Sequence, residues 1–241
     1  MLETKELVKI YKPKKGVPVT ALNKISLKFP EKGMVFLLGK SGSGKSTLLN
    51  VLGGLDKYDG GEIIIKGVSS KNFRQQHFDS YRNTYVGFIF QEYNVLDEFS
   101  VGANIALAIE LQGRRASDSE INDILKQVDL EGFGARKPNE LSGGQKQRLA
   151  IARAILKPAS IYIFDDSFSA LDFMTESRLR ARLASRLKGK TQIVVTQRVT
   201  TAMSCDRIYV FDGGTVSASG THEQLLEACP IYREIYLSQT R

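Results

Sequence analysis

The chain has 241 residues, of which 42% are hydrophobic and 25% are charged, a balance that is ordinary for one globular domain. It contains neither a run of about 18 apolar residues nor an apolar N-terminal stretch, so we expect neither a membrane-spanning helix nor a secretory signal. The two cysteines exclude a disulfide framework and favour reduced thiols in a cytoplasm, whereas the net charge of +8 leaves nucleic acid, anionic lipid and nucleotide phosphate open as partners.

Strand-like runs dominate the first part of the chain. The first of them precede any long helix, which predicts a small antiparallel β layer beside a main sheet. The stretch 44–55 then predicts a helix that ends at the Gly53–Gly54 pair. The predicted strands of this part are 6–11, 25–29, 34–39 and 61–67.

Strands and helices alternate through the rest of the chain. The pattern is helical from Ser100 to about Leu130, and a helix over 143–156 is stopped by Pro158. Another helix begins at about Phe173, and the C-terminal end is helical. Short apolar strands separated by helices predict an α/β fold with a mostly parallel central sheet that helices cover on both faces. The remaining predicted strands are 84–91, 161–165, 191–197, 206–211 and 214–219.

The clearest basic run in the sequence is 177–190. Leu179, Leu183 and Leu187 recur there every four residues, so we interpret the run as an amphipathic helix with a solvated basic face. A nucleic-acid-binding patch is the alternative. Because no aromatic residues interleave with the charges, we expect no nucleic-acid partner.

The sequence GKSGSGKST, at Gly39–Thr47, fits the phosphate-binding pattern G-x-x-x-x-G-K-[ST] between a predicted strand and a predicted helix. Glycines let successive backbone N–H groups turn toward one anion, and the helix N-terminus adds partial positive charge. Lys45 can reach the β- and γ-phosphates of ATP, and Ser46 can ligate Mg²⁺. The alternative is a Gly/Ser-rich turn with an accidental lysine. The predicted nucleotide-binding residues of the loop are Gly39, Ser41, Gly42, Ser43, Gly44, Lys45, Ser46 and Thr47.

The sequence LSGGQ, at Leu141–Gln145, carries a family resemblance. With it the chain resembles, over essentially its whole length, the nucleotide-binding domain of ATP-binding-cassette (ABC) transporters, which are P-loop NTPases. The resemblance implies a head-to-tail homodimer or pseudo-homodimer in which this signature completes the ATP site over the partner's P-loop. An ordinary N-cap role would explain the serine but not two glycines in the first turn. The predicted contacts are Ser142, Gly143, Gly144 and Gln145.

Further site residues follow from the same resemblance. Gln91, after the strand VGFIF, is similar to the Q-loop glutamine that touches Mg²⁺, and Asp165, after IYIF, is similar to the Walker B aspartate that holds the metal. Ser169–Asp172 resembles the D-loop of the dimer interface, and Tyr11 resembles the aromatic that stacks on adenine. Glu92–Val101 lies where family members bind the coupling helices of a transmembrane permease. The alternatives are a strand-end polar residue for Gln91 and a surface tyrosine for Tyr11.

Two positions depart from the family pattern. Asp166 stands where the family usually has a glutamate that polarises the attacking water, so its carboxylate is one methylene further back. Gln197 stands at the switch histidine, and an amide can hydrogen-bond a γ-phosphate but carries no charge near neutral pH. Both departures resemble the degenerate site of heterodimeric ABC exporters, which implies slow hydrolysis. The two histidines stand elsewhere, His77 as an exposed helix residue and His222 as a helix-start residue.

The two parts of the chain resemble different members of the family. Residues 1–157 resemble the lipoprotein-release and macrolide-export ATPases, which pair with separate permeases. Residues 161–241 resemble exporters in which the ATPase is fused to its membrane domain. The change falls near 157–161, between a predicted helix and a predicted strand. Our hypothesis is a recombined, engineered chimera of two ABC domains.

The sequence therefore predicts one ABC ATPase domain over 1–241, with a core of 1–90 and 158–241 and a helical subdomain of about 91–157. The first interpretation is a slow, ATP- and Mg²⁺-dependent motor domain, cytoplasmic and peripheral to the inner face of the cell membrane when it binds a permease. The alternative is an engineered or regulatory ATP-binding domain with no transport partner. A DNA-repair ATPase would need a long coiled-coil insertion between Gln91 and Leu141, and a ribosome-acting protein would carry two cassettes.

Overall fold

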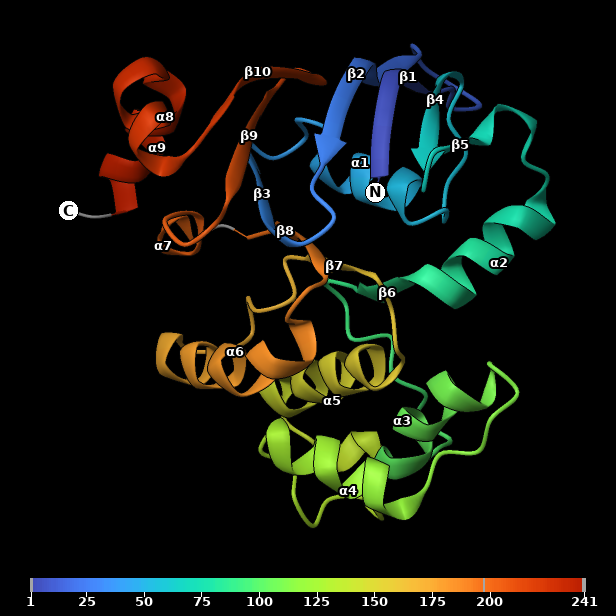
Figure 1. Cartoon of the computed structure of the whole chain (residues 1–241). Coiled ribbons are helices and arrows are strands. Elements are labelled where there is room, and N and C mark those ends of the chain that lie inside the picture. Colours follow the sequence, from blue (N-terminus) through green and yellow to red (C-terminus); the bar gives the residue numbers. More distant parts are fainter. Residues whose placement is uncertain (1, 197, 240–241) are drawn as a thin grey trace. The chain divides into compact units, whose positions relative to one another are not determined.

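The structure is a computed structural model that describes residues 2–196 and 198–239 (Figure 1). The chain divides into two compact units. One holds the residues up to Arg82 and those from Thr191 onwards, and the other holds Asn83–Lys190. The core and helical subdomain expected from the sequence stay a prediction.

The first unit contains the small antiparallel sheet that the sequence predicts. Its strands follow the order β2 (Val19–Phe29), β1 (Leu2–Tyr11), β4 (Gly60–Ile65) and β5 (Val68–Ser69). Strand β1 pairs antiparallel with both β2 and β4, and it is longer than the predicted run 6–11. Side chains alternate across a strand, so Lys9 and Tyr11 share one face of β1.

Four more strands of the first unit carry the phosphate-binding loop. Their order is β10 (Thr215–Gly220), β9 (Arg207–Asp212), β3 (Gly33–Gly39) and β8 (Thr191–Val195). Strand β3 runs parallel to β8 and β9, whereas β10 is antiparallel to β9. The middle of β3 is fully buried, as expected for a central parallel strand.

Helices complete the first unit. Helix α1 (Lys45–Leu52) follows β3 and ends at Gly53, as predicted. At the C-terminal end lie the helices α7 (Val199–Ala202), α8 (His222–Ala228) and α9 (Pro230–Gln239). His222 begins α8 as predicted, and its buried ring shares a 2.7 Å hydrogen bond with the Tyr232 hydroxyl.

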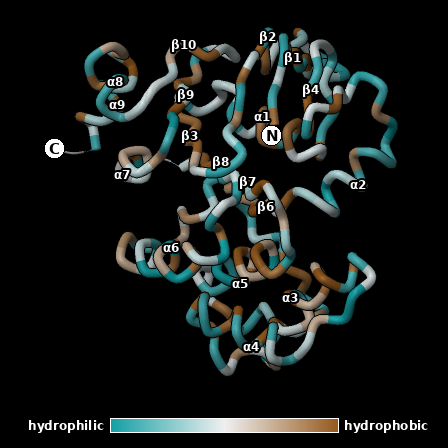
Figure 2. The backbone as a smooth tube through the Cα atoms, viewed as in Figure 1, coloured by the Kyte–Doolittle hydropathy of each residue, from teal (hydrophilic) through white to brown (hydrophobic). Residues whose placement is uncertain are grey.

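Helix α2 (Gln75–Tyr85) runs across the boundary between the units and is not among the predicted helices. Its sequence is polar, and Figure 2 shows it mostly in white and teal. Tyr81 is its one buried residue, and its hydroxyl donates to the Leu52 carbonyl at 2.9 Å. His77 is exposed on this helix, as predicted.

The second unit packs four helices with a pair of parallel strands, β6 (Val86–Ile89) and β7 (Ile161–Asp165). Helix α5 packs on α3 and α4 and on β6. Residues 84–85 belong to α2, which makes β6 shorter than the predicted run 84–91. The helices are α3 (Val101–Glu110), α4 (Asp118–Gln127), α5 (Gly143–Leu156) and α6 (Phe173–Leu187).

Four predictions about this unit are confirmed. Helix α5 has the predicted bounds, and α6 begins at Phe173. The three leucines of the basic run are buried on α6, so the run is one face of an amphipathic helix. Between Gln91 and Leu141 lie two helices of ten residues each, rather than the long coil of a DNA-repair ATPase.

Candidate functional site

The loop between β3 and α1 depends on two glycines for its course. Gly39 and Gly44 have φ angles of 154° and 100°. A Cβ on Gly39 would lie 2.4 Å from the Phe211 carbonyl oxygen, and one on Gly44 would lie 2.4 Å from the Ala21 carbonyl oxygen. Any side chain at either position would collide with backbone, so the loop can follow this path only with glycine there.

The side chain of Lys45 folds back onto this loop and contacts its backbone. Its Nζ atom donates to the carbonyl oxygens of Gly39 and Lys40, both at 2.8 Å, and lies 3.3 Å from the Ser43 Oγ atom. The backbone of Ser43 is held by Lys40 and by Gly214. The ammonium is therefore fixed over the loop, and α1 has no acidic residue in its first turn. This arrangement suits an anion such as a phosphate group.

Tyr11 lies at the end of β1 with 41% of its surface exposed. Its hydroxyl donates to Asp56 Oδ2 at 2.9 Å, while the Lys9 Nζ atom donates to Asp56 Oδ1 at 2.7 Å. Partial burial raises the pKa of Tyr11, a hydrogen bond with the Thr47 side chain lowers it, and the bond to Asp56 raises it again. Tyr11 is thus beside the first turn of α1. No sequence motif pointed to Lys9 or Asp56.

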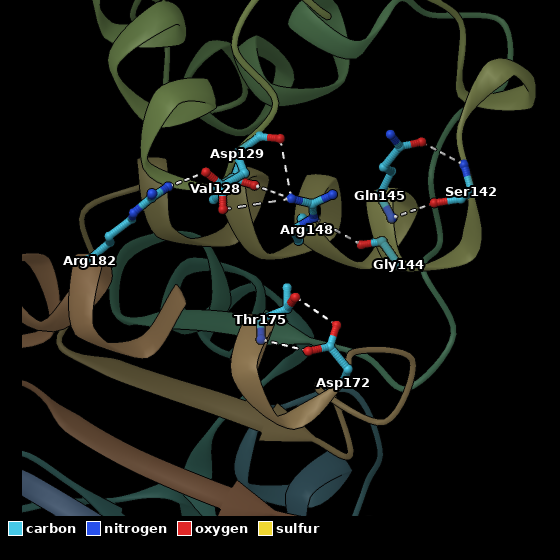
Figure 3. Close-up of polar contacts among 9 residues, drawn as sticks. All are labelled: Val128, Asp129, Ser142, Gly144, Gln145, Arg148, Asp172, Thr175 and Arg182. Carbon is cyan, nitrogen blue, oxygen red and sulfur yellow. Dashed lines mark hydrogen bonds and ion pairs between the residues drawn. The ribbon is translucent and has the colours of Figure 1, made fainter. Parts of the chain in front are cut away.

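The signature residues lie at the start of α5 in the second unit. The Gln145 amide N–H donates to Ser142 Oγ at 3.3 Å, and the Ser142 N–H donates to Gln145 Oε1 at 2.8 Å (Figure 3). These two bonds form a capping box, so the N-cap alternative for Ser142 is observed. The first turn has no acidic residue and keeps its partial positive charge.

The two glycines of the signature have packing reasons of their own. A Cβ on Gly143 would lie 2.9 Å from the Tyr93 hydroxyl oxygen. A Cβ on Gly144 would lie 3.4 Å from the Ala170 carbonyl oxygen. Gly143 thus contacts the segment that follows Gln91, and Gly144 contacts the predicted D-loop.

An arginine holds the signature helix against the end of α4. Arg148 donates from Nη1 to the carbonyl oxygens of Val128, at 3.3 Å, and Asp129, at 3.2 Å (Figure 3). The Asp129 carboxylate accepts a further bond from Arg182 of α6. Helices α5 and α6 are thereby tied to the same short turn.

The two aspartates of IYIFDD end the buried strand β7. Asp165 is 9% exposed and Asp166 is 7% exposed. Asp166 has a φ of 45°, in the left-handed region that aspartate tolerates better than most residues. Its carbonyl oxygen accepts a bond from the Ser169 hydroxyl at 2.9 Å, and the Ser167 hydroxyl donates to the Ile89 carbonyl at 2.8 Å. The turn after β7 is therefore held by its own serines.

Asp172, in the predicted D-loop, caps α6. Its Oδ1 atom accepts from the Thr175 N–H at 2.9 Å, and its Oδ2 atom accepts from the Thr175 hydroxyl at 2.7 Å (Figure 3). These bonds lower the pKa of the Asp172 carboxyl. Asp172 thus has a local structural role beside its predicted interface role.

Gln91 follows β6 and is exposed. The chain after it is fastened to α5 by Arg153, which donates to the carbonyl oxygens of Asn94, at 2.7 Å, and Tyr93, at 3.3 Å. Near these residues is a groove of about 280 Å³ with apolar and cationic walls. Burial lowers the pKa of Lys157, in its wall, to about 8. Other lining residues are Phe88, Phe90, Leu107, Leu111 and Arg153.

The predicted site residues thus form two groups. The P-loop and Tyr11 belong to the first unit, whereas Gln91, the signature, Asp165 and Asp166 belong to the second. Gln197, the predicted switch position, lies outside the described residues.

A sequence profile of the ABC transporter family matches residues 22–169. The chain belongs to the ABC transporter family. This ABC cassette is 36% identical over 222 residues to the lipoprotein-releasing system ATP-binding protein LolD of Chromohalobacter salexigens, with 90% of the cassette and 93% of that protein covered. It is 37% identical over 214 residues to the sulfate/thiosulfate import ATP-binding protein CysA of Synechocystis sp., where the match covers 86% of the cassette and 58% of that protein. The cassette therefore spans little more than half the length of CysA.

Solved structures agree with the sequence comparison. The cassette matches a dimeric structure of the ATP-binding cassette MJ0796 bound to ADP and Pi with a TM-score of 0.85 at 33% identity, covering 92% of this chain and 98% of that one. The predicted family and the α/β P-loop NTPase fold are confirmed, and the chain is an ABC ATPase cassette. Within the described residues, each helix is too short or too polar to cross a bilayer.

Proposed function

We propose that this ABC cassette binds Mg-ATP through Gly39–Thr47, dimerises head to tail and hydrolyses ATP slowly as the motor domain of a membrane transporter. The observation that carries the proposal is the phosphate loop, in which Lys45 Nζ is held 2.8 Å from two loop carbonyls at the N-terminus of α1. Backbone amides, a fixed ammonium and a helix dipole together favour a polyanion.

The oxygen donors of the proposed site suit magnesium. Ser46 offers a hydroxyl, Gln91 an amide carbonyl and Asp165 a carboxylate, and the family resemblance assigns all three to one metal. Groups of three or more His, Cys, Asp or Glu that could hold a metal are absent from residues 2–196 and 198–239. A magnesium ion bound by few protein ligands and by the phosphates of its nucleotide agrees with this, because Mg²⁺ usually binds to ATPases in that way.

The proposed dimer uses the signature in trans. The capped first turn of α5 presents two glycines and no acidic side chain, which supports binding of a partner's γ-phosphate. The dimeric structure of MJ0796 supports the same assembly for this cassette. In this arrangement Ser142, Gly143, Gly144 and Gln145 contact the nucleotide on the partner's P-loop.

Slow hydrolysis is proposed from two side chains. The Asp166 carboxylate is one methylene shorter than the usual glutamate, and about an ångström of misplacement costs on the order of 100-fold in rate. Gln197 cannot carry the charge of the usual histidine. Lys45, Gln91, Asp166 and Gln197 are the residues that we assign to hydrolysis.

The proposed membrane partner is a permease that binds at Glu92–Val101. LolD is an ATP-binding protein of a lipoprotein-releasing system, and CysA is one of an import system, so both relatives serve transport. Arg153 fixes the backbone of this segment to the signature helix, which supports a coupling role. A cassette bound in this way would be peripheral to the inner face of the cell membrane.

The second candidate is an engineered or regulatory ATP-binding domain without a transport partner. Its support is the same pair, Asp166 and Gln197, together with the chimera hypothesis. The suspected junction near 157–161 falls where α5 has ended and β7 begins, so two homologous domains could be joined there without cutting an element.

ATP titration of the purified chain tests the binding proposal. Lys45→Ala should abolish ATP binding because the loop loses its cation, whereas Lys126→Ala, at an exposed position on α4, should leave it unchanged. Retained affinity in Lys45→Ala would refute the role of the loop. Size exclusion with Mg-ATP should show a dimer of the parent, and a strict monomer at saturating ATP would contradict the dimer proposal.

A further inference from the structure

Lys9 is a buried cation whose partners lie in the loop after α1. It is 9% exposed, although lysine is seldom buried without a partner. Its Nζ atom donates to Asp56 Oδ1 at 2.7 Å and to the Lys57 carbonyl at 2.6 Å. The ammonium is therefore paired on the inner side of the loop, and it fixes the position of the Asp56 carboxylate.

The same carboxylate fixes an aromatic ring. Asp56 Oδ2 accepts from the Tyr11 hydroxyl at 2.9 Å, so the two oxygens of Asp56 bind two neighbouring side chains of β1. The Lys9 Nζ atom also lies 4.9 Å from the centre of the Tyr11 ring. The ring is thus restrained both at its hydroxyl and beside its face.

The Tyr11 hydroxyl is also connected to the phosphate-binding loop. The side chain of Thr47, the last residue of the loop motif in the first turn of α1, is close enough to this hydroxyl to lower the pKa of Tyr11. The ring itself remains 41% exposed. An aromatic surface is therefore presented next to the phosphate-binding loop, with its hydroxyl held by Asp56.

We propose that Asp56, fixed by Lys9, is a positioning residue that holds the Tyr11 ring ready to stack on the base of a purine nucleoside triphosphate. The inference rests on the proposed function, since it takes Gly39–Thr47 as the triphosphate site. Without Asp56 the ring samples other rotamers, and the fraction of molecules competent to stack decreases. Apparent affinity decreases by the same fraction.

Charge balance is part of the arrangement. Partial burial opposes ionisation of Asp56, but hydrogen bonds from Lys9 and Tyr11 outweigh it and lower the pKa of the carboxyl. Asp56 is therefore an ionised acceptor at neutral pH, and Lys9 cancels its charge beside a site built for an anion. A neutral pair of this kind restrains the ring without repelling phosphate.

The test compares ATP with inorganic tripolyphosphate, which has the charge of the nucleotide but no base. Calorimetric affinities for both are measured with the full chain in the parent, Asp56→Ala, Tyr11→Phe and the double variant. Asp56→Ala and Tyr11→Phe should each weaken ATP binding about 3- to 10-fold, the worth of one hydrogen bond. The double variant should be no weaker than the stronger single one, and tripolyphosphate affinity should stay unchanged throughout.

Two matched controls remove similar groups from the same sheet region. Tyr58→Phe deletes a hydroxyl that is 2.8 Å from Ser70 Oγ, and Glu62→Ala deletes a carboxylate that pairs with Lys71. Both should keep the ATP affinity of the parent. Asp56→Ala removes the Lys9–Asp56 pair, which Tyr11→Phe keeps intact. If Asp56→Ala is partly unfolded, the ATP affinity of Tyr11→Phe alone decides the test.

The outcomes separate this inference from the proposed function. If Asp56→Ala and Tyr11→Phe keep the ATP affinity of the parent but Tyr11→Ala loses it, the positioning role of Asp56 is overturned. Stacking of the Tyr11 ring on the base would still stand. An equal loss of ATP and tripolyphosphate affinity shows a structural effect on the loop and also overturns the positioning role. If the parent binds neither compound, or Lys45→Ala binds ATP normally, the proposed function itself is wrong.

Discussion

A methyl group on Gly44 would lie 2.4 Å from the carbonyl oxygen of Ala21. Both residues are held by backbone structure, Ala21 in β2 and Gly44 at the start of α1, so neither can move away cheaply. The phosphate-binding loop is therefore packed against the antiparallel sheet at a point that tolerates no side chain.

This contact predicts that Gly44→Ala destabilises the fold by about 3 kcal/mol, because a backbone collision adds to the strain of a positive φ. Gly42→Ala is the matched control, since Gly42 also has a positive φ, 75°, but a Cβ there meets nothing within 4 Å. Only conformational strain remains in the control, about 1 kcal/mol. Urea unfolding without nucleotide measures both losses. Equal losses would mean that the Ala21 contact does not limit the loop.

The Asp172 cap predicts a loss of stability in Asp172→Ala. Thr175 would lose both hydrogen bonds, and α6 its N-cap, which should lower the melting temperature by about 2–4 °C. Asp172→Asn keeps a side-chain acceptor and should lose less. An unchanged melting temperature in Asp172→Ala would leave only the proposed interface role for this residue.

The same carboxyl predicts a pH dependence. Hydrogen bonds from Thr175 lower its pKa in the folded chain, so the folded state favours the ionised form. The contribution of Asp172 to stability is present above the pKa of the unfolded chain and is lost as pH falls through the folded pKa. The stability difference between the parent and Asp172→Ala should therefore shrink below about pH 4. A difference that stays constant down to pH 2 would contradict this assignment.

Elements and site residues could be predicted from the sequence where a single contiguous segment contains the whole motif. Helix α5 was predicted with its bounds because Ser142 and Gln145 form a capping box in four residues and Pro158 ends the pattern. Helix α2 was missed because only Tyr81 of its eleven residues is buried, so no apolar period marks it. The P-loop was likewise visible as one motif.

The rest of the site depends on contacts that are distant in sequence. Lys9 and Asp56 are 47 residues apart in the sequence. The pairing of β1 with β4 brings the loop that holds Asp56, between α1 and β4, next to Lys9. The glycines of LSGGQ were assigned to phosphate alone, yet Gly143 also makes room for Tyr93. Tertiary contacts of this kind leave no local pattern in a single sequence.

The burial of Lys157 predicts that replacing it with a hydrophobic residue raises the stability of the cassette. Burial lowers its pKa to about 8 in the folded chain, below the value of 10.5 for a free lysine. At pH 7 the folded chain must bury a charged ammonium, and this penalty fades as pH rises from about 8 to about 10.5. Lys157→Met should therefore be more stable than the parent at pH 7, with a smaller gain at pH 9.5. Lys188→Met, at an exposed position, is the control, and a gain that does not change with pH would exclude the charge as its cause.

The acid after β7 gives the decisive test of slow hydrolysis. Asp166→Glu moves the carboxylate forward by one methylene, and Gln197→His restores a group that can hold a charge beside the γ-phosphate. Because catalytic geometry is so sensitive to distance, the double variant should turn over ATP at least 10-fold faster than the parent at equal ATP affinity. Asp166→Asn is the matched control and should be slower than the parent, because the amide cannot accept a proton from water. Steady-state phosphate release at saturating Mg-ATP measures all three. Equal turnover of parent and double variant would show that neither side chain limits hydrolysis, and a fast parent would contradict the proposal of a slow cassette directly.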